Sequence, residues 1–146
     1  FKHNMARIRK DVRIRGLQNE VIFDATLANP DSCALIVSYS GETYVLDNII
    51  KVLKNKNIPV IVITSIGDNT LSRKAECVLR ICTREKLYSK IATFSTDSAI
   101  TYLLDVLYSC IFALDYDRNL NLKIETSKSI ETGRFSTVDI LKEEEF

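Results

Sequence analysis

The chain has 146 residues, and its 20 lysines and arginines nearly balance its 19 aspartates and glutamates, giving a formal net charge of +1. This is the length of one ordinary globular domain, which can bury a core without disulfides or metals. A nearly neutral chain creates no strong field that recruits nucleic acid or an anionic membrane. The composition therefore predicts a single domain over residues 1–146 and argues against global charge attraction to either partner.

The cysteines and the single histidine, His3, are not spaced as metal ligands are, because no two cysteines form a CxxC pair. The longest apolar tract, Ile100–Leu114, is shorter than a membrane span and contains Asp105. We therefore expect no metal, no cofactor and no membrane association. The N-terminus is not signal-like, and buried, reduced thiols are expected in a cytoplasmic protein. The four cysteines lie in apolar stretches: Cys33, Cys77, Cys82 and Cys110.

The first thirty residues predict a helix end, an edge strand and a second helix. Phe1–Lys10 is basic with a few apolar residues, as at the end of a helix. Val12–Arg15 alternates apolar and basic side chains, as an edge strand with one solvated face does. From Gln18 to Ala28 apolar residues recur at helical spacing, and Asn29-Pro30-Asp31 ends that helix. The basic cluster over residues 7–15 is compatible with a nucleic-acid contact, although a solvated face that protects the edge is favoured.

The middle of the chain alternates strands and helices. Cys33–Val37 is a short unbroken apolar run, which is typical of a strand buried on both faces. After it come a helix at Thr43–Lys56, a second buried strand at Val60–Ile63, a short helix at Thr70–Ala75 with Asp68 or Asn69 as its N-cap, and a third strand at Cys77–Ile81. Such alternation indicates right-handed crossovers and a mainly parallel sheet. The predicted fold class is α/β, a three-layer α/β/α sandwich.

The remainder of the chain is predicted to be helical. Ser89–Leu114 carries an apolar stripe and a second face that is nearly as apolar, so this helix must bury more than one face. One face covers the sheet. The other either meets a partner subunit or lies within its own domain, and the pattern leaves both open. Asn119–Gly133 predicts a more polar helix, and Lys142–Phe146 a frayed tail.

Polar side chains follow the first buried strand, in the turn Ser38-Tyr39-Ser40-Gly41-Glu42-Thr43. Free N–H groups at the start of the following helix, with the positive end of its dipole, form an anion site. Gly41 lets the backbone approach a ligand closely, while Ser38, Ser40 and Thr43 offer hydroxyl donors. A phosphate cradle is one interpretation. The alternative is a polar turn in which Ser40 or Thr43 only caps the helix.

A second pair of hydroxyl residues, Thr64-Ser65, follows the next buried strand. Because ligands of parallel sheets bind outside the carboxyl ends of the strands, both clusters are expected at one edge. Their convergence favours the phosphate interpretation, with amides and hydroxyls as donors and no lysine required.

These motifs resemble the sugar isomerase (SIS) domain family in Leu35–Thr43, Pro59–Ser65 and Asp68–Leu71. Tyr102–Tyr108 is similar to a helix of the RpiR-type (MurR/RpiR) transcription regulators, in which a helix-turn-helix domain precedes an SIS domain that senses a phosphorylated sugar. The resemblance implies an SIS-type, flavodoxin-like sandwich whose opening strand, with its glycine- and serine-containing loop, precedes residue 1. DNA would then be bound only through a domain outside this chain, and a homodimer or higher homo-oligomer is expected.

The resemblance also implies which residues hold the ligand. Thr96-Asp97 replaces a Ser-Arg pair that is frequent in the family, so no anion-binding role is carried over to that position. The implied phosphosugar-binding residues are Ser38, Ser40 and Thr43 for the phosphate, Gly41 and Glu42 through backbone contacts, and Thr64 and Ser65 beside the sugar.

No residue is predicted to be catalytic. An aldose–ketose isomerase needs a positioned base of suitable pKa. His3 is far in sequence from both turns, and at a helix N-terminus the dipole makes Glu42 a weaker base. Glu85 follows the last strand, where a surface glutamate is the commoner case. We therefore expect a phosphosugar-sensing domain of a transcription regulator. The alternatives are an SIS-type sugar phosphate isomerase and a dimerisation module with a vestigial pocket.

Overall fold

The computed structural model describes residues 1–15, 18–130, 138 and 140, and the structural statements below refer to these residues. Two compact units are distinguished, residues 13–107 and residues 1–12 together with the described residues after 107. The elements in chain order are α1 (Lys2–Arg7), α2 (Gln18–Thr26), β1 (Ala34–Val37), α3 (Tyr44–Asn55), β2 (Val60–Ser65), β3 (Cys77–Ile81), α4 (Phe94–Ala113) and α5 (Tyr116–Ile130).

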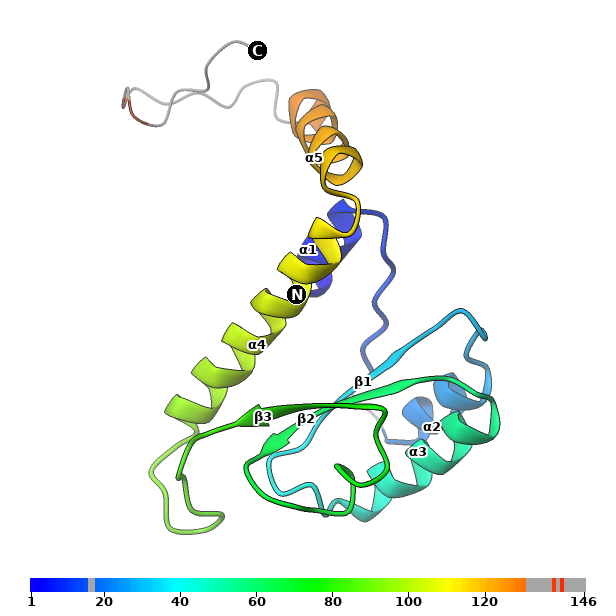
Figure 1. The fold of residues 1–146 in the computed structure, drawn as a ribbon, viewed down its shortest axis with the longest axis vertical. Helices are drawn as coiled ribbons and strands as arrows, with labels where there is room; N and C mark the ends of the chain where they lie inside the picture. Colours follow the sequence, from blue (N-terminus) through cyan, green and yellow to red (C-terminus); the bar gives the residue numbers. More distant parts are fainter. Residues whose placement is uncertain (16–17, 131–137, 139, 141–146) are drawn as a thin grey trace. The chain divides into compact units, whose positions relative to one another are not determined.

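The three strands form one parallel sheet in the order β1-β2-β3 (Figure 1). Ala34 lies opposite Val60, and Ile61 lies opposite Cys77. Each strand therefore ends at the same edge of the sheet, and α3 connects β1 to β2 as a crossover helix. The predicted α/β class with a parallel sheet is confirmed.

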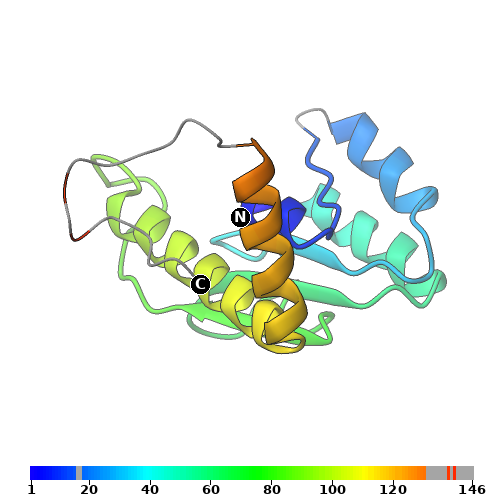
Figure 2. The ribbon, with the colours of Figure 1, turned by 90° about the horizontal axis from the view of Figure 1, so that it is seen from above.

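The core lies between this sheet and helices α2 and α3, which pack against each other on one of its faces (Figures 1 and 2). The apolar stripe of α3 supplies Ile49, Ile50 and Leu53, and β2 supplies Val60 and Val62. The sheet and these two helices are thus arranged in layers, as the alternation of elements predicts.

Two predicted elements are wrong. Val12–Arg15 forms no strand, because no described strand pairs with it, and Arg15 instead makes an ion pair with Asp24 at 2.8 Å. Thr70–Ala75 is a turn and not a helix. So short a segment gains few helical hydrogen bonds. It ends at Glu76, whose carboxylate accepts the Val60 N–H at 2.7 Å and whose N–H donates to the Val60 carbonyl, so the chain is drawn into β3.

Several side chains that the apolar runs predict to be buried are exposed in the structure. Val37 at the end of β1 is 42% exposed, so β1 is not buried on both faces as β2 nearly is. β1 is an edge strand of the described sheet, and a central strand such as β2 has neighbours on both sides. The four cysteines, predicted to be buried, are all exposed.

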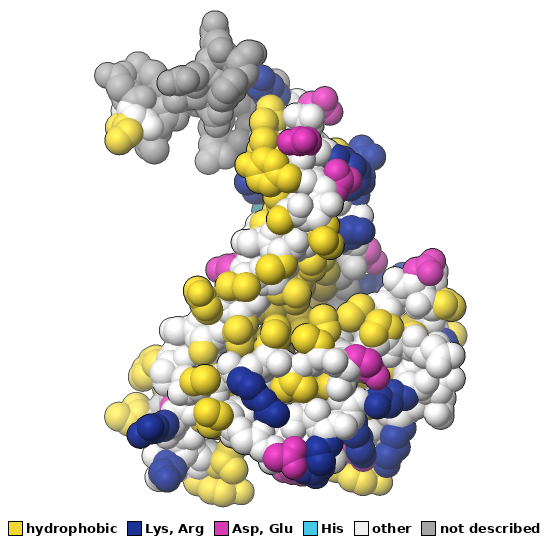
Figure 3. Space-filling model, in the orientation of Figure 1, with side chains coloured by type: hydrophobic (Ala, Val, Ile, Leu, Met, Phe, Trp, Pro, Cys, Tyr) yellow, Lys and Arg dark blue, Asp and Glu magenta, His cyan; other side chains and the backbone are white. Residues whose placement is uncertain are grey.

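Helix α4 begins at Phe94 and not at Ser89, and Thr96 is its only buried residue in the described structure. Hydrophobic side chains line the face of α4 that Figure 3 shows. None of the described helices is alone long and apolar enough to cross a membrane, and only α4 and α5 together, as a bent pair, have sufficient length and composition. Helix α5 is confirmed up to Ile130, and both its predicted last turn and the predicted tail at Lys142–Phe146 lie outside the described residues.

Candidate functional site

The two predicted hydroxyl clusters meet at the carboxyl edge of the sheet. The ladder between β1 and β2 continues past β1, since the Ser38 N–H donates to the Ile63 carbonyl at 3.0 Å. The Ser65 N–H donates to the Tyr39 carbonyl at 3.1 Å. The turn that begins at Ser38 is therefore fixed directly beside the end of β2.

Hydroxyl groups hold this turn in a compact form. The buried Ser38 Oγ accepts the Gly41 N–H at 3.3 Å and lies 3.2 Å from the Thr43 Oγ1. The Ser40 Oγ accepts the Glu42 N–H at 3.3 Å. The three hydroxyl residues predicted to bind phosphate are thus gathered within one small loop, although their contact with a ligand stays a prediction.

The N-terminus of α3 carries no side-chain cap. Thr43 occupies the N-cap position in an extended conformation, but its hydroxyl makes no cap hydrogen bond and lies near Ser38 instead. Backbone bonds of the first turn begin with the Leu46 N–H, which donates to the Thr43 carbonyl. The N–H groups of Tyr44 and Val45 therefore point out of the helix start, where its dipole is positive. Such a terminus suits an anion.

Gly41 is required by its conformation and by its neighbour. Its φ is +66°, a left-handed value that other residues adopt at a cost. A Cβ placed there would lie 2.1 Å from the Cγ of Asn69. Asn69 is itself fixed, because its amide nitrogen donates to the Thr64 hydroxyl at 3.0 Å and its amide oxygen accepts the Ser72 N–H at 2.9 Å. Asn69 thereby caps the turn that follows, as expected for that position.

Thr64 is fully buried and supports the turn from beneath. Its hydroxyl donates to the Tyr39 carbonyl at 3.3 Å and accepts the amide of Asn69. Ser65 is half-buried, and its carbonyl accepts the Arg80 guanidinium at 3.1 Å. The geometry gives Thr64 a role in positioning the turn, while contact of Thr64 and Ser65 with a sugar stays a prediction.

The charge of Glu42 is engaged by a neighbouring turn. Its carboxylate accepts the Thr70 N–H at 2.9 Å and the Thr70 hydroxyl at 2.6 Å. These hydrogen bonds, the hydroxyl one first, lower the pKa of Glu42, and nearby Arg73 acts in the same direction. Glu42 is thus kept ionised by these donors and is a weak base.

Glu85 is bound in a similar way at the start of α4. Its carboxylate accepts hydrogen bonds from the hydroxyls and N–H groups of Ser95 and Thr96. The side-chain hydrogen bonds from Ser95 and then Thr96 lower the pKa of Glu85 to about 2. A base for proton transfer near neutral pH needs a much higher value.

Sequence reasoning missed three residues that shape this region. The sequence predicts Asn69 only as a possible helix cap, and its contact with Gly41 has no sequence signature. The Tyr39 hydroxyl donates to the carbonyls of Thr83 and Glu85 beyond β3. The Lys90 Nζ lies 5.4 Å from the centre of the Tyr39 ring, so a cation does stand near the turn. An isolated lysine in a polar loop gives no sequence signal of this placement.

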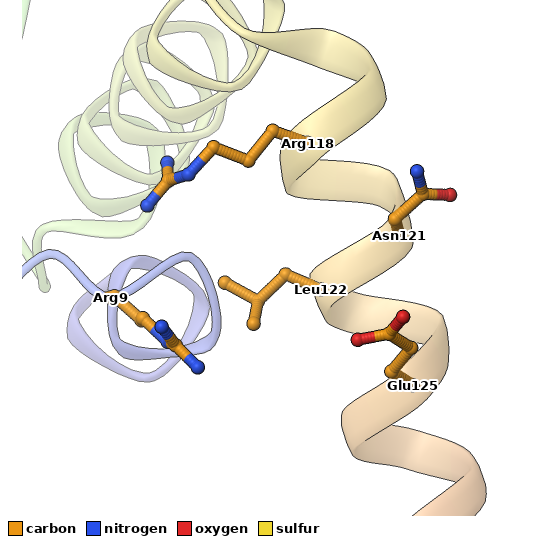
Figure 4. A pocket seen from close by; sticks show the side chains of 5 residues that line it. All are labelled: Arg9, Arg118, Asn121, Leu122 and Glu125. Carbon is orange, nitrogen blue, oxygen red and sulfur yellow. The ribbon is translucent and has the colours of Figure 1, made fainter.

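The described surface also contains two pockets that are lined by residues outside the turn. One, of about 370 Å³, lies in the unit that contains α1 and α5 and is lined by Arg9, Arg118, Asn121, Leu122 and Glu125. Figure 4 shows Arg118 and Leu122 extending from α5 toward the segment that carries Arg9. The other pocket lies by the start of β2, at the opposite end of that strand from the turn. No group of three or more potential metal ligands occurs among the described residues.

The domain belongs to the parallel α/β class, and its hydroxyl-rich turn lies between β1 and the uncapped helix α3. The sequence profile of the SIS domain family matches residues 1–110, and the chain belongs to this family.

Two curated relatives and one solved structure are similar to the chain. An uncharacterized HTH-type transcriptional regulator of Thermotoga maritima is 30% identical over 115 residues, covering 77% of this chain and 40% of the relative. A probable arabinose 5-phosphate isomerase of Haemophilus influenzae is 31% identical over 81 residues, covering 56% and 24%. The structure of the Vibrio vulnificus NanR protein complexed with ManNAc-6P has a TM-score of 0.76 at 20% identity, covering 92% of this chain and 50% of that chain, and confirms the fold. The chain spans less than half the length of either curated relative.

We predict that Gly41→Ala destabilises the domain by more than the about 1–2 kcal/mol of a left-handed alanine, because its Cβ also collides with Asn69. Asn69→Ala removes that obstacle while losing the bonds to Thr64 and Ser72. The double variant should therefore be less destabilised than the sum of the two single variants, as measured by urea unfolding. Strict additivity would show that the two side chains do not compete for this space.

We also predict a pH-dependent contribution from Glu85. Its pKa in the folded state is lowered from 4.5 to about 2, so folding favours the ionised form. This contribution is complete above about pH 4.5 and is lost as the pH falls toward 2. Thermal melts should show Glu85→Gln less stable than the wild type near neutral pH, with a difference that narrows on acidification. A difference of the same size at every pH would contradict the assignment.

Proposed function

We propose that the domain binds a phosphorylated sugar at the turn Ser38–Thr43 and serves as the effector-sensing domain of an RpiR-type transcription regulator of carbohydrate metabolism. The phosphate would be held by the hydroxyls of Ser38, Ser40 and Thr43, by backbone contacts with Gly41 and Glu42, and by the N–H groups at the start of α3. Thr64 and Ser65 would lie on the side of the sugar. This binding needs no metal or cofactor.

The observation that carries this proposal is the uncapped start of α3 directly behind the hydroxyl turn. An N-cap hydroxyl normally occupies the first N–H groups of a helix. Here Thr43 is directed to Ser38, so these N–H groups are available to an external acceptor, and a helix N-terminus favours an anion such as phosphate. The complex of the NanR protein with ManNAc-6P supports a phosphosugar as the ligand class.

An isomerase is the second candidate, favoured by the similarity to the probable arabinose 5-phosphate isomerase. The carboxylates of Glu42 and Glu85 argue against it, because hydrogen bonds lower the pKa of both. Neither group is suited to take a proton from a sugar carbon near neutral pH. A dimerisation module with a vestigial pocket is the third candidate, and it predicts no ligand at all.

The regulator would act in the cytoplasm as a homodimer or higher homo-oligomer, with DNA bound through a domain outside this chain. The similarity to an HTH-type regulator supports this arrangement. Apolar side chains of α4, including Phe94 at 73% and Tyr102 at 68% exposure, suit the face of a partner subunit. Ligand binding would then shift the equilibrium between subunit arrangements and thereby the affinity for DNA.

The proposal is tested by thermal melts with a panel of hexose and pentose phosphates, with the unphosphorylated sugars as controls. A phosphorylated ligand at about 100 times its Kd should stabilise the fold by about 2.7 kcal/mol, and the free sugar should give no comparable shift. Product analysis of the same samples separates the candidates. A shift without product supports the sensor, turnover supports the isomerase, and no shift with any phosphate contradicts the sensor.

The same assay with variants locates the ligand. Ser40→Ala and Thr43→Ala should each weaken the affinity by about 1–3 kcal/mol, since each leaves a phosphate oxygen without a donor. Melting each variant without ligand separates this loss from that of the hydrogen bonds within the turn. Thr26→Ala is the matched control, because it removes a hydroxyl that bonds only within α2. Unchanged affinity in both turn variants would exclude this cradle.

A further inference from the structure

The first turn of α4 is held by a carboxylate from another segment. The N–H groups of Ser95 and Thr96 donate to one oxygen of Glu85 at 2.9 and 3.1 Å, and the Thr96 hydroxyl donates to the other oxygen at 2.7 Å. Helix starts are commonly capped by the residue directly before them, whereas Glu85 lies ten residues before Ser95. The loop after β3 and the start of α4 are therefore joined by four hydrogen bonds, counting that of the Ser95 hydroxyl.

Tyr39 connects this cap to the turn. Its hydroxyl donates to the backbone carbonyl of Glu85 at 2.9 Å. A second connection runs through Thr83, whose hydroxyl donates to the Tyr39 hydroxyl at 3.3 Å and lies 3.2 Å from the hydroxyl of buried Thr96. The Lys90 ammonium lies over the Tyr39 ring and 4.0 Å from the Glu85 carboxylate. The side chain of Tyr39 thus ends among the groups that fix α4.

The backbone of Tyr39 belongs to the candidate phosphate site. It lies between Ser38 and Ser40, and its carbonyl accepts hydrogen bonds from the Ser65 N–H and the Thr64 hydroxyl. An aromatic side chain has few rotatable bonds, so a displacement at its backbone reaches its hydroxyl with little loss. A displacement of the turn therefore also moves the Tyr39 hydroxyl, which contacts the segment that caps α4.

We propose that Tyr39 is a positioning residue. It couples phosphate binding at the turn to the stability of the hydrogen bonds that cap the first turn of α4. The coupling rests on the proposed function, since it assumes that phosphate binds at the turn. Bound phosphate holds the turn in the conformation that the structure shows, so the hydrogen bond from the Tyr39 hydroxyl to Glu85 breaks less often and the first N–H groups of α4 open less often. By linkage, whatever stabilises the start of α4 strengthens phosphate binding by the same factor.

The test is amide hydrogen exchange of the chain, followed with inorganic phosphate against potassium chloride of equal ionic strength. Phosphate should slow exchange both in the turn and at Ser95 and Thr96 in the wild type, in the α4 segment by about fivefold, the factor of one hydrogen bond. Tyr39→Phe keeps the ring and removes the hydroxyl, so it should retain protection of the turn and lose protection of α4. Tyr88→Phe removes the hydroxyl of a residue that is 96% exposed, in the loop between β3 and α4, and should behave as the wild type.

Each outcome decides between the two proposals. Equal protection of α4 in the wild type and Tyr39→Phe would overturn the coupling. Protection of the turn alone in the wild type would also overturn it and leave the phosphate site intact, whereas protection of neither segment would contradict the phosphate site and the coupling together. Glu85→Gln is a second variant, at the other end of the connection. It should likewise lose the protection that phosphate adds at Ser95 and Thr96, while it retains the protection that phosphate adds in the turn.

Discussion

The buried amide of Asn69 is the contact on which the candidate site depends. It binds the Thr64 hydroxyl at the end of β2 and the backbone of Ser72, and it occupies the space where any side chain at position 41 would lie. The turn after β1 therefore packs directly against the turn after β2, and only glycine at position 41 leaves room for the Asn69 side chain. This contact directs the hydroxyls and the start of α3 to one edge of the sheet.

Much of the fold follows from the sequence because the decisive signals are local. The run Val60–Ile63 is apolar without interruption, and the stripe of α3 repeats at helical spacing, so both were predicted within a few residues. Burial depends on neighbours that a pattern does not reveal, so the exposure of Val37 and of the cysteines was missed. The strand predicted at Val12–Arg15 failed for the same reason, since a strand exists only with a partner.

The candidate site shows the same division. The hydroxyl residues of the turn could be found from sequence, because strand, turn and helix follow one another directly. Asn69, Tyr39 and Lys90 could not, because they reach the turn or its surroundings through tertiary contacts between separate segments. These contacts give the turn its shape and connect it to α4, as the proposed coupling between the turn and α4 requires.

The central claim is that backbone N–H groups at the start of α3 bind phosphate. A titration of the 15N-labelled chain with inorganic phosphate, followed through amide chemical shifts, tests it most directly. The account predicts saturable shifts that are largest from Gly41 to Val45. Shifts confined to the pocket of Arg9 and Arg118, or the absence of saturable shifts in the turn, would contradict it.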